Sequence, residues 1–144
     1  MQGRARVEAM RILLAVVVAA AVVAGAAVGA VPIAKPIPTA TLQAEFAAFN
    51  ARNYAASYTA YTPRFKAKCP YAVYRKHTAA LRAKVPSPLS VTFTNVRTAG
   101  DKAYLAYHVV LGGQAVDTVT AAKPDLFVRV GGLWYDEIDP QTTC

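Results

Sequence analysis

Two side chains in the second half of the chain, His108 and Asp117, are of the types that move protons in enzymes. The alternation of residues 103–111 predicts a strand that carries His108. Asp117 lies on the segment expected to form the next strand, where its carboxylate could approach the imidazole. Such a pair can act as a general acid and base, provided that both side chains enter one pocket. The alternative is a packed or surface histidine without a catalytic role.

Four aromatic residues could instead line a cleft for a small molecule. Tyr54, Tyr58 and Tyr61 recur at helical spacing, and Trp134 on a late strand could close the far wall. The result would be an apolar pocket whose phenolic hydroxyls orient a ligand. The alternative is that the tyrosines cover the edge of the core and direct their hydroxyls into water.

The positive charge of the chain is unevenly distributed. The formal net charge is +8, and residues 46–100 contain no Asp or Glu, whereas Asp136, Glu137 and Asp139 gather near the C-terminus. A basic surface raises the local concentration of anionic partners, although it can also serve only solubility. The residues expected to form this surface are Arg64, Lys66, Lys68, Arg75, Lys76, Arg82 and Lys84.

The two cysteines, Cys69 and Cys144, are expected to form a disulfide in an oxidising compartment. The alternative is a reactive thiol. Two cysteines supply too few ligands for a metal site, and no metal or other cofactor is expected. No cysteine stands near the end of the N-terminal apolar run, so lipidation after cleavage is excluded.

The N-terminal residues 1–30 have the composition of an export signal. Arg4, Arg6 and Arg11 precede an uncharged apolar run over residues 12–31. We expect cleavage after Ala30, with an uncleaved membrane anchor as the alternative. In both cases the domain lies outside the cytoplasm, secreted or anchored facing outward, so an anionic partner would be a protein, a wall polymer or a lipid rather than nucleic acid.

A proline-rich linker, residues 31–40, precedes the domain, residues 41–144. A helix is expected to begin with Thr41 as N-cap and Glu45 in its first turn, and to end at Thr62 and Pro63. A second helix is expected to begin at Pro70. Its inward face should consist of Tyr74, Thr78, Leu81 and Val85.

After Pro88 the residue pattern changes from one typical of helices to one typical of strands. Gly100, Gly112-Gly113 and Gly131-Gly132 separate short runs of alternating residues. The sequence therefore predicts an α+β fold, in which two or three N-terminal helices pack on a curved antiparallel sheet of about four strands.

Three segments resemble nuclear transport factor 2-like domains, a cystatin-like α+β superfamily. Residues 46–54 resemble the aromatic first helix of these domains, residues 100–104 their hairpin entry, and residues 128–135 their final glycine-turn hairpin with a tryptophan. The resemblance covers residues 41–140 and implies a cone-shaped fold with a pocket between helix and sheet. It suggests a small exported member of this superfamily in a bacterial envelope. Domains of this superfamily often form homodimers through the sheet.

Three functions remain open, because this scaffold serves many activities. The favoured hypothesis is an exported non-catalytic envelope module that binds a protein or an anionic partner through its basic surface. The first alternative is a carrier of a small apolar ligand in the helix-sheet pocket. The second is an isomerase- or dehydratase-like enzyme that uses His108 and Asp117.

Overall fold

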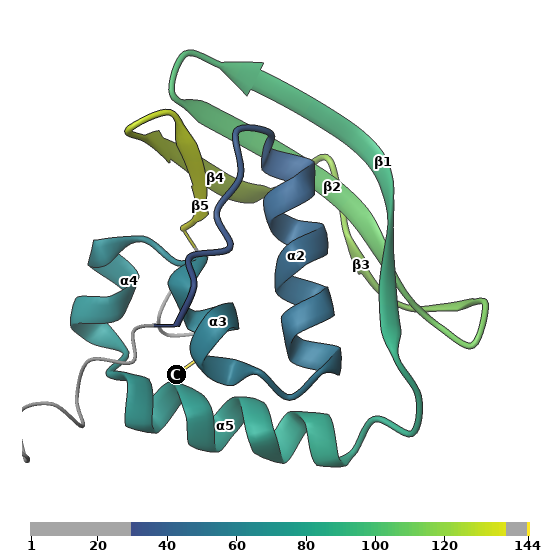
Figure 1. The fold of residues 1–144 in the computed structure, drawn as a ribbon. Helices are drawn as coiled ribbons and strands as arrows, with labels where there is room; N and C mark the ends of the chain where they lie inside the picture. Colours follow the sequence, from purple (N-terminus) through teal and green to yellow (C-terminus); the bar gives the residue numbers. More distant parts are fainter. Residues whose placement is uncertain (1–29, 138–143) are drawn as a thin grey trace, which may run out of the picture. The chain divides into compact units, whose positions relative to one another are not determined.

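A computed structural model describes residues 30–137 and Cys144. The expected signal peptide or anchor and the cleavage site lie largely outside these residues, as does Asp139. No helix among the described residues is long and apolar enough to cross a membrane. The α+β class is confirmed: helices α2 to α5 precede strands β1 to β5 (Figure 1).

The helical half begins earlier than expected and contains more breaks. Its elements are α2 (Pro38–Asn50), α3 (Tyr54–Thr59), α4 (Pro63–Lys68) and α5 (Tyr71–Ala83). Pro38 starts α2 because proline is preformed for the first helical position. Thr41 is therefore an internal residue and not the N-cap. Its buried hydroxyl accepts a hydrogen bond from the Lys35 N–H (2.9 Å) and donates one to the Trp134 carbonyl (3.1 Å).

A residue with left-handed backbone conformation ends α2 and divides the single long helix that the sequence predicts. Arg52 adopts a left-handed conformation, with φ 58°. The Arg52 N–H bonds to the Phe49 carbonyl and the Asn53 N–H to the Ala48 carbonyl, which is the Schellman arrangement. The Asn53 side chain then accepts from the Ala56 N–H and starts α3.

We expect Arg52→Gly to raise the free energy of unfolding by about 0.5 to 1 kcal/mol, because a side chain in the left-handed region is strained and glycine is not. Chemical denaturation measures the change. As a control, Arg75→Gly on the exposed face of α5 should lower stability by about 1 kcal/mol. A loss of stability in Arg52→Gly would contradict this account of the break.

The sheet is organised around one long central strand. Its elements are β1 (Leu89–Ala99), β2 (Lys102–Leu111), β3 (Gln114–Val119), β4 (Asp125–Val130) and β5 (Leu133–Asp136). Strand β2 pairs with β1 along one edge, and its other edge is shared by β3 and β4. The sheet thus has five strands, where the sequence predicts about four, and both β3 and β4 pair with β2.

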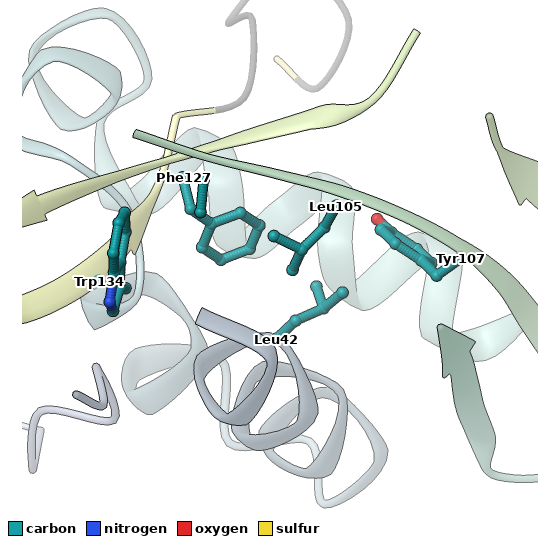
Figure 2. Packing of buried hydrophobic residues seen from close by; sticks show 6 residues of the cluster. Leu42, Leu105, Tyr107, Phe127 and Trp134 are labelled. Carbon is teal, nitrogen blue, oxygen red and sulfur yellow. The ribbon is translucent and has the colours of Figure 1, made fainter. Parts of the chain in front are cut away.

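Helix α2 packs against the sheet through β1 and β5, and this contact buries the main core (Figure 1). Leu42 of α2 lies in one buried cluster with Leu105 and Tyr107 of β2, Phe127 of β4 and Trp134 of β5 (Figure 2). In β2 the residues of this cluster are Ala103, Leu105 and Tyr107, that is, every second residue, because alternate side chains of a strand point to the same face.

A second core cluster joins α3, α4 and α5 around the cysteines. Phe65, Cys69 and Tyr74 are fully buried there, with Tyr54, Tyr58 and Cys144 packed against them. Cys69 and Cys144 lie at disulfide distance, with their Cα atoms 5.9 Å apart, as the sequence predicts. The bond fixes the last residue of the chain to the end of α4.

Candidate ligand-binding pocket

A pocket of about 550 Å³ opens between α2, α5 and the sheet. This volume is in the range of sites for small molecules, roughly 300 to 1,000 Å³. Its walls are mainly apolar, and come from α2, from the C-terminal half of α5 and from β2. The main apolar residues of these walls are Leu42, Phe46, Phe49, Leu81, Val109 and Leu111.

Two buried carboxyl groups, Glu45 and Asp136, form the polar part of the pocket. Glu45 lies on the inward face of α2 and is 8% exposed, and Asp136 at the end of β5 is 1% exposed. Asp136, one of the acids that gather near the C-terminus, is thus part of the interior. The Tyr61 hydroxyl donates a short hydrogen bond to Glu45 Oε1. Asp136 lies within hydrogen-bonding reach of Glu45, so that the two carboxyls can share a proton.

Burial raises the pKa of Glu45 to about 7, and the nearby charge of Asp125 adds to this effect. The hydrogen bonds from Tyr61 and Asp136 oppose it but do not cancel it. Glu45 is therefore expected to exchange a proton near neutral pH. A group that exchanges a proton near neutral pH inside an apolar pocket is typical of functional sites.

Three tyrosine hydroxyls surround this pair, and each has an internal partner. The Tyr107 hydroxyl donates to the Asp125 carboxylate, and the Tyr74 hydroxyl shares a 2.6 Å hydrogen bond with the Ser57 hydroxyl. Burial raises the pKa of Tyr74 to about 12, and burial also raises the pKa values of Tyr61 and Tyr107. The tyrosines therefore stay neutral, and Tyr61 and Tyr107 hold the carboxyl groups of Glu45 and Asp125 in place.

The pocket is acidic although the chain is basic. Glu45, Asp117 and Asp136 line it, and Lys84 is the one Lys or Arg among its lining residues. Lys84 is exposed, because it follows the end of α5. No group of three or more His, Cys, Asp or Glu in the described part of the chain is arranged to hold a metal ion.

The structure separates His108 from Asp117. Asp117 is paired with Val109 across the β2–β3 ladder and lines the pocket, whereas His108 is paired with Thr118. Neighbouring residues of a strand point to opposite faces. His108 therefore lies on the outer face, where its Nδ1 is 2.9 Å from the Thr118 hydroxyl. His108 and Asp117, the catalytic candidates considered from the sequence, therefore do not form an acid–base pair.

Only one of the four aromatic candidates lines the pocket. Tyr61 does so, since it follows α3 and points to Glu45. Tyr54 and Tyr58 pack in the cysteine cluster, where the Tyr58 hydroxyl donates to the Cys69 carbonyl (2.7 Å). Trp134 is part of the main core (Figure 2). The left-handed Arg52 divides the predicted helix, so Tyr54 and Tyr58 belong to α3 and not to the helix that carries Glu45.

The expected basic surface is partly used within the fold. Arg64 forms a 3.0 Å ion pair with Glu137, Lys66 lies over the Tyr58 ring, and Arg82 donates to the Val85 carbonyl (2.8 Å). Burial lowers the pKa of Lys66. The exposed members of the set are Arg64, Lys68, Arg75, Lys76 and Lys84.

Sequence reasoning missed Glu45, Tyr74, Tyr107 and Asp136 as pocket residues. A signal for Glu45 was present, because it lies on the apolar stripe of α2 together with Leu42 and Phe49. An acidic residue at such a position is expected to be buried, and Asp and Glu are almost never fully buried without a partner. Asp136 gave no comparable signal beside the acidic Glu137.

No protein-family model matches the chain, and no curated protein gives a significant sequence match.

Proposed function

We propose that this domain binds a small, mainly apolar molecule in the pocket between α2, α5 and the sheet. The observation that carries the proposal is the pocket itself, whose apolar walls end in two buried carboxyl groups, of which Glu45 accepts a hydrogen bond from Tyr61. Apolar walls with a few fixed polar groups are the usual form of a small-molecule site. A module that worked only through its surface would have no need of such a space.

We also propose that the domain is a nuclear transport factor 2-like module that works outside the cytoplasm. The helices before a curved antiparallel sheet, with α2 lying against it, support the first part. The cysteine pair supports the second, because disulfides persist in oxidising compartments. Binding of an anionic partner through the exposed Lys68, Arg75 and Lys76 stays a prediction, since these side chains are free to meet one.

Filling the pocket tests the proposed function. Val109 lines the pocket, and Val110 follows it on the opposite face of β2. We expect the neutral apolar dye Nile red to bind the wild type, Val109→Trp to weaken this binding at least tenfold, and Val110→Trp to change it less than twofold. Fluorescence titration measures all three, with circular dichroism as a check of folding. Equal effects of the two substitutions, or no binding of the dye to the wild type, would exclude the pocket as the site.

A further inference from the structure

A second cavity of about 220 Å³ lies between α2 and the start of β1, beside the main pocket. Phe46 of α2 and Leu89 of β1 line both spaces, so these two side chains form the wall between them. The other residues around the second cavity are Gln43, Ala47, Asn50, Ser90 and Val91. An apolar chain that fills the main pocket therefore meets this wall, and any excess length has to leave through the open mouth into water.

The two sides of this wall are fixed in different ways. Phe46 belongs to α2 and packs against the main core. Leu89 is the first residue of β1, which is an edge strand of the sheet. The connection before it contains Pro86 and Pro88, which have no backbone N–H to donate. The position of Leu89 therefore depends on partners outside this connection.

Asn50, the last residue of α2, is such a partner. Its Oδ1 accepts a hydrogen bond from the Leu89 N–H (2.9 Å), and its Nδ2 donates one to the Leu89 carbonyl (2.7 Å). A side-chain amide has both donors and an acceptor, so it pairs with Leu89 as a neighbouring strand would. Phe46 lies one turn before Asn50 on the same helix, so these two hydrogen bonds, the Asn50 clamp, join the two sides of the wall.

We infer that Asn50 is a positioning residue that limits the length of the apolar ligand, because its clamp holds Leu89 in the wall and closes the main pocket toward the second cavity. This inference rests on the proposed function and concerns which ligands the same pocket selects. Without the clamp Leu89 can move, and the second cavity becomes continuous with the main pocket of about 550 Å³. A longer chain then enters space beside Ala47 and Val91 instead of water.

The test measures the binding of straight-chain primary alcohols with 8, 10, 12 and 14 carbons, from 1-octanol to 1-tetradecanol, by competition with Nile red. Each CH₂ group that enters an apolar space should tighten binding about fourfold. In the wild type we expect this gain to fall below twofold per CH₂ beyond a limiting chain length, which marks the wall. In Asn50→Ala the full gain should continue for at least two more carbons.

Asn53→Ala is the matched control. The Asn53 side chain also accepts a hydrogen bond from a backbone N–H, that of Ala56 at the start of α3, but it lines neither cavity. Its substitution should lower the stability of the domain through the lost cap and leave the limiting chain length unchanged. If Asn53→Ala shifts this length as far as Asn50→Ala does, the effect comes from general loosening and the inference is overturned.

Leu89→Ala examines the wall from its other side. It removes the side chain that lines both cavities and keeps the backbone groups that the clamp binds, so it remains informative if Asn50→Ala does not fold. It should also raise the limiting chain length by at least two carbons. Circular dichroism checks the folding of all three variants.

The inference and the proposed function fail differently. If the gain continues through 14 carbons in the wild type, or if a folded Asn50→Ala or Leu89→Ala keeps the wild-type limit, the inference is wrong and the apolar pocket stands. If neither the dye nor any of the alcohols binds, both proposals are wrong.

Discussion

Cys144→Ser is expected to lower the free energy of unfolding by about 4 kcal/mol. The disulfide with Cys69 closes a loop with a sequence separation of 75, and the chain-entropy model assigns about this loss to opening a loop of that length. Cys144 is half-buried, whereas Cys69 is fully buried, so the substitution at Cys144 changes the core less. Urea denaturation of the oxidised wild type and the variant measures the difference.

Reduction of the wild type serves as the control for Cys144→Ser. It should give the same loss, and reducing agent should have no further effect on the variant. A difference below about 1 kcal/mol between oxidised wild type and variant would mean that the bond does not constrain the unfolded chain as proposed.

The stability of the domain should decrease as the pH rises from about 4.5 to above 7. Burial raises the pKa of Glu45 from 4.5 to about 7, so in this interval the folded state binds more protons than the unfolded state. The stabilisation is complete below the unfolded pKa and is lost as the pH passes the folded pKa. At about 1.4 kcal/mol for each pKa unit, the loss is on the order of 3 kcal/mol. The raised pKa of Asp125, caused by burial, acts in the same direction.

Glu45→Gln isolates this contribution. The amide keeps an acceptor for Tyr61 and does not ionise, so most of the fall in stability across this interval should disappear. Glu137→Gln, at the surface ion pair, is the matched control and should retain the fall. Denaturation midpoints at pH 4.5, 6 and 8 measure the effect. An equal pH dependence in wild type and Glu45→Gln would show that Glu45 does not hold a proton in the folded protein.

The fold class followed from local signals that act within a few residues. Proline at the start of α4 and before α5, and glycine pairs before β3 and β5, restrict the backbone whatever the rest of the chain does. The break of α2 was not predictable in this way, because Arg52 is not a residue type that favours the left-handed region. The pairing of β2 with both β3 and β4 depends on long-range packing and leaves no local mark in the sequence.

The pocket was harder to predict than the fold. A tyrosine at helical spacing looks the same whether it packs against a disulfide, as Tyr58 does, or meets a buried acid, as Tyr61 does. His108 and Asp117 lie on opposite faces of the sheet. The bulge between β2 and β3 causes this, because it shifts the register so that Asp117 is paired with Val109 and not with His108. The uneven distribution of basic residues predicts a functional surface. The structure instead places two acids, Glu45 and Asp136, in the interior.

The site of binding can be observed directly by nuclear magnetic resonance, with intermolecular Overhauser contacts between bound 1-octanol and the methyl groups of the protein. If the pocket binds apolar molecules, octanol should contact Leu42, Val109 and Leu111, which line it. Contacts confined to exposed residues outside the pocket, such as Val96 and Val130, would contradict the central claim.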